Sequence, residues 1–299
     1  KPVNEVTYTW GTVRGYGGGQ VWTQVLLSSG WSTSQIRTAD ANGYFAIPLT
    51  YGSSTVGEYT FRVGASTPFG TVYSNQFTLV RTASNLVEKW RGKDIEVFPV
   101  SRKVVALTFD GGADNAAVSR ILSTLKANSV PATFFVTGDF ARSFPSDVRA
   151  MAQAGHPVGN HSNTHPYFTQ ITDAAIRQEL SLADSAISPL TGKPTAPLFR
   201  FPYGDRTASE IQVVNNAGYI PIRWTVDTLG WQGTSGGITT AIVRQRVLDR
   251  LQPGAIVLMH VGAHPQDRST LDADALQGMI NDLRARGYAF ATVSALLVE

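Results

Sequence analysis

The sequence predicts a two-domain protein in which an all-β domain over residues 1–86 precedes an α/β domain over residues 87–299. Up to about residue 82 the chain is rich in Thr, Ser, Val, Tyr and Gly, and apolar residues alternate with polar ones, as in half-buried strands. From Val104 onward, continuous apolar runs alternate with segments of helical period. With 299 residues, 42% of them hydrophobic, the chain is long enough to form two modest cores.

The first domain has the features of an antiparallel β-sandwich. Alternating runs such as EVTYTWGTV and EYTFRVGAS are separated by the turn clusters YGGG, DANG and YGSST. Short strands at this spacing favour a sandwich, and the pattern resembles that of immunoglobulin-like modules. Trp10, Trp22 and Trp31 are candidate platforms for a sugar ring, but in a sandwich we expect them to be buried.

The second domain has the features of a parallel sheet covered by helices. Its strand-like runs are VVALTF, ATFFV, IPIRWTV, AIVLMH and FATVS, and a linker-like stretch over residues 87–103 precedes the first of them. Strands as apolar as these are buried on both faces, which predicts a barrel or a related open α/β fold. Helical periodicity predicts helices over residues 115–128, 145–154, 173–188, 207–217, 239–251 and 272–286.

Polar side chains follow several of the predicted strands. They are Asp110, Tyr203, Asp205, Asp227 and His260. In parallel α/β folds the carboxyl ends of the strands carry the chemistry, so these residues are candidates for a functional site.

Composition excludes several classes of protein. The net charge of +3 comes from scattered Lys and Arg, with no basic run typical of a nucleic-acid-binding patch. The longest apolar runs are far shorter than the ~20 residues that a membrane-spanning helix needs. The absence of cysteine excludes disulfides and thiolate metal sites. We therefore expect neither a nucleic-acid partner nor a membrane span. We also expect a monomer.

Two of the five histidines, all of which lie in the second domain, form an H-x-x-x-H pair in the segment GNHSNTHP. The imidazoles of His161 and His165 can converge on one cation if the segment makes a single turn. The spacing alone is equally compatible with a pair of capping or core histidines.

Four further segments accompany this pair in a fixed order. They are ALTFDGGAD at residues 106–114, RFPYG at 200–204, WTVDTLGW at 224–231 and IVLMH at 256–260. From about Val104 to Leu297, this series resembles the motifs of the polysaccharide deacetylase family, carbohydrate esterase family 4, which shares the NodB homology domain. The resemblance implies a distorted (β/α) barrel of the NodB type and hydrolysis of acetyl groups on a glycan.

The resemblance also implies roles for individual residues. Asp110 corresponds to the general base, His161 and His165 to metal ligands, and His260 to the general acid. Of the others, Arg200 orients the base, the Tyr203 amide binds the oxyanion, Asp227 pairs with the acid, Trp231 forms a wall of the cleft, and Leu258 lines the acetyl-methyl pocket.

Two positions depart from the family pattern. The usual motif is TFDD, whose second Asp completes an Asp-His-His metal site, but this chain has Gly111 there. Asp114 is the candidate replacement ligand, although an Asp at this place is also a natural helix cap. The family often has Asp before the tryptophan of its fourth motif, where this chain has Gly230. Asp227 is then the acidic residue left in that motif.

The expected function is metal-dependent removal of N-acetyl groups from N-acetylglucosamine polymers, either chitin-type oligomers or peptidoglycan. The same site would suit an acetylxylan esterase, and a third possibility is a catalytically impaired glycan-binding protein. Zinc is the expected metal, and cobalt or nickel suits the same ligands. Because the substrate is a polymer and the β-rich domain resembles an accessory module, we expect a secreted or cell-wall-associated protein.

Overall fold

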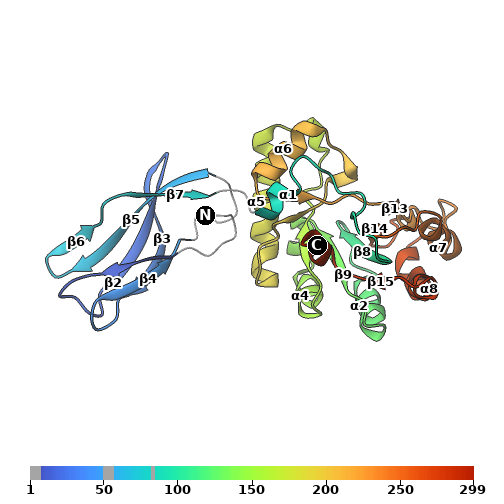
Figure 1. Ribbon diagram of the computed structural model, residues 1–299, viewed down its shortest axis with the longest axis horizontal. Coiled ribbons are helices and arrows are strands. Elements are labelled where there is room, and N and C mark those ends of the chain that lie inside the picture. Colours follow the sequence, from blue (N-terminus) through green and yellow to red (C-terminus); the bar gives the residue numbers. More distant parts are fainter. Residues whose placement is uncertain (1–7, 50–56, 82–84) are drawn as a thin grey trace. The chain divides into compact units, whose positions relative to one another are not determined.

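A computed structural model describes residues 8–49, 57–81 and 85–299 (Figure 1). The chain divides into two compact units. One comprises Lys1–Glu88 with Asn216–Gly218, and the other comprises Lys89–Asn215 with Tyr219–Glu299. No helix in the described part of the chain is both long enough and apolar enough to span a membrane.

The described residues of the first unit up to Arg81 form antiparallel β-strands and no helix, as predicted. Strands β1 and β4 form one sheet, and β3-β2-β5-β6 form another in which β7 also pairs with β5. Buried Val21, Ile47 and Ala65 pack together, which joins β4 to the larger sheet. An immunoglobulin-like topology remains a prediction, and residues 5–7 of the run EVTYTWGTV lie outside the described residues. The strands are β1 (Tyr8–Thr12), β2 (Gln20–Leu27), β3 (Gly30–Thr38), β4 (Tyr44–Pro48), β5 (Gly57–Thr67), β6 (Gly70–Tyr73) and β7 (Phe77–Arg81).

The three tryptophans of this unit are less buried than we expected. Trp10 is 78% exposed, so the expectation that it packs inside a sandwich is wrong. Trp22 is half-buried and meets Tyr73 edge to face, with ring centroids 6.4 Å apart. Trp31 is also half-buried and lies beneath the Arg62 guanidinium.

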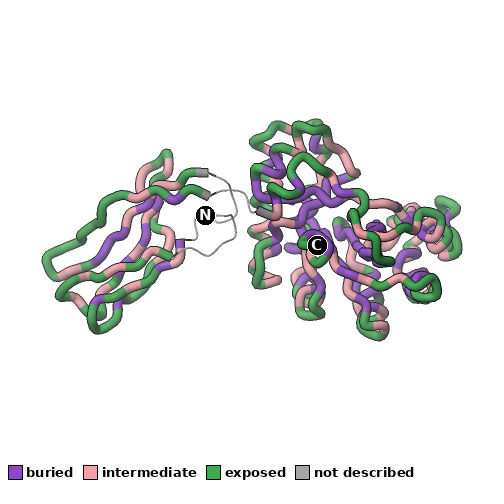
Figure 2. Tube along the Cα trace, in the orientation of Figure 1, coloured by how far each residue is buried: buried purple, intermediate pink, exposed green. Residues whose placement is uncertain are grey.

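The second unit is built on a curled parallel sheet that forms a half-barrel, consistent with a NodB-type (β/α) barrel. The strand order is β12-β11-β10-β9-β8-β14-β13, and β15 pairs with β8. The central strands β8, β9 and β14 are mostly apolar and are buried along their length except at His260 (Figure 2). The strands are β8 (Val104–Gly111), β9 (Ala132–Val136), β10 (Val158–Asn160), β11 (Leu198–Phe199), β12 (Ile220–Pro221), β13 (Val226–Asp227), β14 (Ala255–His260) and β15 (Ala289–Phe290).

Six helices coincide with the predicted segments to within three residues at each end. Their first turns are often fixed by a Thr cap: Thr172 and Thr239 each accept a hydrogen bond from the backbone N–H three residues further on. The helices are α1 (Asn85–Lys89), α2 (Val118–Ala127), α3 (Gly138–Ser143), α4 (Pro145–Gln153), α5 (Asp173–Thr191), α6 (Ala208–Asn216), α7 (Thr240–Asp249), α8 (Leu271–Ala285) and α9 (Val293–Leu297).

Two apolar segments differ from the prediction. IPIRWTV is divided between two short strands, β12 and β13. FATVS supplies only the end of β15 and then begins α9, because Thr292 caps that helix through the N–H of Ala295. Short apolar runs do not distinguish a strand from the start of a buried helix, and here the cap decides between them.

The stretch 87–103, interpreted above as linker-like, is largely packed into the second unit. Ile95 and Phe98 are 3% and 1% exposed, and Ile95 forms a bridge with Ile222. Trp90 is buried and donates a hydrogen bond from its indole N–H to the Leu297 carbonyl at 3.0 Å. These residues therefore belong to the fold that carries the site.

Candidate active site

Strand register brings the two candidate proton-transfer groups to neighbouring positions. His260 at the end of β14 pairs with Asp110 near the end of β8. On the other side of β14, Asp227 at the end of β13 pairs with Leu258. Because these strands are parallel, their carboxyl ends meet at one edge of the sheet.

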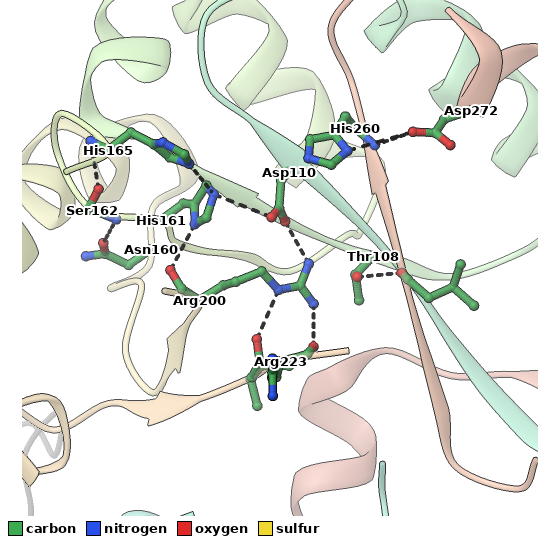
Figure 3. A network of polar contacts seen from close by, with 12 residues as sticks. Thr108, Asp110, Asn160, His161, Ser162, His165, Arg200, Arg223, His260 and Asp272 are labelled. Carbon is green, nitrogen blue, oxygen red and sulfur yellow. Dashed lines mark hydrogen bonds and ion pairs between the residues drawn. The ribbon is translucent and has the colours of Figure 1, made fainter. Parts of the chain in front are cut away.

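Arg200 holds the carboxylate of Asp110 in place. Arg200 is completely buried and donates a 2.7 Å hydrogen bond from Nη1 to Oδ1 of Asp110 (Figure 3). Its Nε and Nη2 donate to the carbonyl oxygens of Ile222 and Arg223, each at 3.0 Å. The guanidinium is thereby held in one orientation, and so is the carboxylate that it binds.

The surroundings of Asp110 favour its ionised form. Burial by itself would raise the pKa of this carboxyl, but the charges of Arg200 and His260 and the Arg200 hydrogen bond outweigh burial, so the pKa is lowered. Asp110 is therefore a carboxylate at neutral pH and can accept a proton.

The H-x-x-x-H segment forms a tight turn that points both imidazoles to one place. Ser162 and His165 have positive φ values of 66° and 65°, and the Ser162 hydroxyl accepts a hydrogen bond from the His165 N–H at 3.0 Å. The Nε2 atoms of His161 and His165 lie 3.1 Å apart (Figure 3). Burial lowers the pKa of both rings, that of His165 to about 3, so both are neutral at neutral pH.

The chemistry of these atoms fits a divalent cation. His161 Nδ1 lies 2.8 Å from the Arg200 carbonyl, which only accepts hydrogen bonds, so Nδ1 carries the proton and Nε2 is bare. That bare nitrogen faces His165 Nε2 and, at 3.4 Å, the carboxylate oxygen Oδ2 of Asp110. A cation held by the two Nε2 atoms would take the place of the hydrogen bond between the two rings, and Nε2 is a usual metal-binding atom of histidine.

Gly111 does not offer the third ligand that the family pattern would provide. A Cβ added there would lie 3.1 Å from Val136, 3.3 Å from Val261 and 3.4 Å from Phe140. An acidic side chain at this position would therefore start among buried apolar groups on the present backbone. Among the described residues, no group of three or more His, Cys, Asp or Glu is arranged to hold a metal.

Asp114, the candidate replacement, is engaged in hydrogen bonds. Its Oδ1 accepts from the backbone N–H groups of Ala116 and Ala263, at 2.9 and 2.8 Å, and its Oδ2 accepts from Arg268 at 3.0 Å. Burial would raise its pKa, but these bonds lower it. The carboxylate thus ties the loop after β8 to the loop after β14, and its role as a metal ligand stays a prediction.

A different carboxylate from the expected one lies beside His260. We expected Asp227 to pair with this histidine, but Asp227 accepts hydrogen bonds from the Leu229 N–H and the Trp231 indole, at 2.8 and 3.2 Å. Asp272 on α8 has its Oδ2 only 3.9 Å from His260 Nδ1. Burial would lower the pKa of His260, but Asp272, Asp110 and Asp227 raise it above the ordinary value.

Most of the predicted site residues line one cavity of about 430 Å³. Those lining it are Asp110, Asp114, His161, His165, Trp231 and His260. Leu258 is 4% exposed on β14, and Arg200 lies behind Asp110.

Tyr203 lies beside the histidine turn with an exposed side chain. Its backbone has a positive φ of 58°, and its ring packs against His165 with centroids 4.5 Å apart. It also stacks on Tyr167, with ring centroids 4.2 Å apart and nearly parallel planes. Tyr167 and Tyr203 are 45% and 57% exposed, so a sugar ring could reach this aromatic pair.

Sequence reasoning missed two residues that the fold brings to the site. Tyr167 gave a weak signal, because it lies only two positions beyond the H-x-x-x-H pair. Asp272 gave no signal: an acidic residue in the first turn of a helix is ordinary, and only the packing of α8 against β14 brings it to His260.

Comparison with known proteins identifies the family. The profile of the polysaccharide deacetylase family matches residues 99–222. A peptidoglycan-N-acetylglucosamine deacetylase from Bacillus cereus is 33% identical over 201 residues, which cover 66% of this chain and 70% of the relative. The chain belongs to the polysaccharide deacetylase family. As a polysaccharide deacetylase it is a hydrolase acting on amides, and members of its family are generally metal-dependent.

Other members of the polysaccharide deacetylase family are similar over the same region. A chitooligosaccharide deacetylase from Azorhizobium caulinodans is 31% identical over 193 residues, 62% of this chain and 90% of the relative. The crystal structure of a peptidoglycan N-acetylglucosamine deacetylase has a TM-score of 0.63 at 30% identity and covers 70% of this chain and 94% of its own. A pseudoenzyme of carbohydrate esterase family 4 from Bacillus anthracis has a TM-score of 0.64 at 27% identity and covers 80% and 83%.

Proposed function

We propose that this protein removes N-acetyl groups from N-acetylglucosamine polymers, of the peptidoglycan or chitin-oligomer class, outside the cell or at its wall. The proposal is supported by the relatives, which are named for deacetylation of these two kinds of glycan. The observation that carries it is that an ionised Asp110 and His260, neighbours on β8 and β14, line one cavity together with His161 and His165.

Asp110 is the base in this proposal. A water molecule adds to the acetyl carbonyl carbon, and Asp110 takes its proton, since the lowered pKa keeps the carboxylate ready to accept. Arg200 holds the carboxylate in place through its 2.7 Å bond. Because Arg200 makes two further bonds to backbone carbonyls, the base is oriented before the substrate arrives.

His161 and His165 would hold the metal ion, zinc in the first place and cobalt or nickel as alternatives. When bound, the ion supplies Lewis acidity to the acetyl oxygen and to the attacking water. The protein supplies two neutral imidazoles, one of them with its tautomer fixed by the Arg200 carbonyl. Asp114 is the candidate carboxylate ligand, and it would have to give up hydrogen bonds to act as one.

His260 is the acid. Its raised pKa keeps the imidazolium populated, and it gives a proton to the amine as the carbon–nitrogen bond breaks. Acetate and the free amino sugar are the products. The Tyr203 amide binds the oxyanion, Trp231 forms a wall of the cleft, Leu258 lines the methyl pocket and Asp227 fixes the Trp231 indole.

The test is acetate release from N-acetylglucosamine oligomers before chelation, after chelation and after zinc is restored. We expect activity that disappears and returns, with Asp110→Asn and His260→Gln each lowering kcat by roughly 10²- to 10⁴-fold. Acetate release from acetylxylan but not from the N-acetylglucosamine oligomers would show that the protein is an ester hydrolase. No release from either polymer under any condition would favour a glycan-binding protein over an enzyme.

A further inference from the structure

The space beside Gly230 is filled by Asp272. A Cβ added to Gly230 would lie 2.3 Å from Oδ1 of Asp272 and 2.5 Å from its Cγ, closer than real contacts permit. The two positions therefore exclude each other: a side chain at residue 230 and the present Asp272 carboxylate cannot occupy the same space. The position at which the family often has an acidic residue is thus empty here, and a carboxylate from α8 stands next to it.

Asp272 is bound from two directions. It is 3% exposed, and its Oδ1 accepts a 2.6 Å hydrogen bond from the Thr228 hydroxyl. Its Oδ2 accepts a 2.8 Å bond from the His260 backbone N–H (Figure 3). It lies in the first turn of α8, where the helix dipole favours a negative charge. The carboxylate is therefore fixed relative to the backbone of His260.

The His260 ring turns one nitrogen toward this carboxylate. Nδ1 is buried and has no hydrogen-bond partner among the described residues, and Asp272 Oδ2 is 3.9 Å from it. A buried polar nitrogen without a partner is costly, so a small rotation of the ring that closes this gap is favourable. Catalytic hydrogen bonds are often long in the absence of substrate.

Other charged groups face His260 from several elements. Asp110 on β8 and Asp227 on β13 raise the pKa of His260. Asp110 also interacts electrostatically with His161 on the histidine turn. Asp227 is committed to Leu229 and Trp231. Asp272 is thus the carboxylate placed to hydrogen-bond the ring itself.

We infer that Asp272, which occupies the space beside Gly230, is the positioning residue that orients the His260 ring and keeps its Nδ1 atom protonated. The inference rests on the proposed role of His260 as the acid. A carboxylate in the fourth motif was expected to pair with His260, and here a carboxylate on helix α8 takes that role. The glycine at position 230 therefore reflects a relocation of the negative charge and not a loss of the site.

The first test is Asp272→Asn, with Asp274→Asn as the matched control. Asn keeps the size of the side chain, and its oxygen can still accept from the His260 N–H, but the charge is lost. Asp274 lies in the same turn of α8 and pairs with Arg120 on the surface. We expect Asp272→Asn to lower kcat roughly 10-fold or more with little change in KM and to move the alkaline limb of the pH profile down by about one unit. The control should move neither.

A direct readout separates this inference from the proposed function. The His260 ring is titrated by NMR in zinc-supplemented protein labelled at histidine, and its signal is assigned with His260→Gln. We expect its pKa to fall in Asp272→Asn and to stay in place in Thr228→Val, which removes the other hydrogen bond of Asp272 and leaves its charge. If the His260 ring has the same pKa in the parent and in Asp272→Asn, the inference is overturned, even if the parent releases acetate. If the parent releases no acetate, only the proposed function is contradicted.

A double variant tests whether a carboxylate at residue 230 can replace the one at residue 272. It also keeps the inference testable if Asp272→Asn does not fold. Gly230→Asp alone should be inactive or unstable because of the 2.3 Å approach to Asp272. Combined with Asp272→Ser, which empties the space, Gly230→Asp should recover at least tenfold in kcat over Asp272→Ser, with the alkaline limb returning upward. Purely additive effects of the two substitutions would contradict the relocation.

Discussion

Arg200 is a fully buried cation whose partners are a carboxylate and two carbonyls. Arg200→Met would leave Asp110 charged and buried without its cation, so we expect a loss of about 3–5 kcal/mol in the free energy of unfolding. Urea denaturation measures this loss. The control is Arg102→Met, which removes a half-exposed ion pair with Glu299 and should cost less than about 1 kcal/mol. Equal losses in the two variants would mean that Arg200 is not a central support of the site.

His165 makes the stability of the chelated protein depend on pH. Its pKa is lowered to about 3 by burial and by His161, whereas an unfolded histidine titrates near 6.5. As pH falls from about 6.5 to 3, the unfolded chain gains a proton that the folded chain does not, so stability falls. At pH 4.5 the loss from this group is roughly 2–3 kcal/mol. The free energy of unfolding, measured in urea at pH 7 and pH 4.5, should differ less between the two pH values in His165→Gln than in the parent. An identical difference in both proteins would show that His165 is not the source of the pH dependence.

At the scale of elements, the site depends on how the loops after β8 and β14 are tied together. Asp114 joins them through Ala263 and Arg268. We expect Asp114→Ala to lower the free energy of unfolding by about 1–3 kcal/mol, because two backbone N–H groups and a guanidinium lose their acceptor.

Zinc affinity of the same variant distinguishes the two roles of Asp114. If the carboxylate is also a metal ligand, Asp114→Ala should weaken zinc binding about tenfold or more, as measured by competition with a chelating dye. Unchanged affinity with reduced stability would restrict Asp114 to the clamp between the loops and leave the two histidines as the protein's ligands.

The elements that periodicity could predict are those whose burial is continuous. The runs at β8, β9 and β14 are apolar at nearly every position, so their sequences identify them as interior strands. The segment at 220–227 could not be divided correctly from sequence, because what separates β12 from β13 is pairing with different neighbours, β11 and β14.

The site shows the same division between local and non-local information. The H-x-x-x-H turn and the Asp110 motif are short segments whose spacing carries their chemistry, so they were recognisable. The pairing of Asp272 with His260 joins two elements through Thr228 and the space at Gly230, and no local pattern encodes such packing.

At the scale of the whole molecule, the catalytic unit begins before the region that the family profile covers. The profile starts at residue 99, yet Trp90, Ile95 and Phe98 are each no more than 6% exposed. Trp90 meets Phe98 edge to face at 6.0 Å, and the Phe98 N–H donates to the Gly254 carbonyl at 2.9 Å, just before β14.

Two fragments test this boundary. A fragment of residues 85–299 retains these side chains and all the site residues, so we expect the kcat of the full chain on soluble oligomers and cooperative unfolding. A fragment of residues 99–299 loses three buried side chains worth about 1.5–3 kcal/mol each, and should melt far lower or fail to fold. Thermal unfolding and acetate release measure both. Equal melting of the two fragments would place residues 85–98 outside the catalytic fold, and an inactive but folded 85–299 fragment would show that the first unit is needed for chemistry.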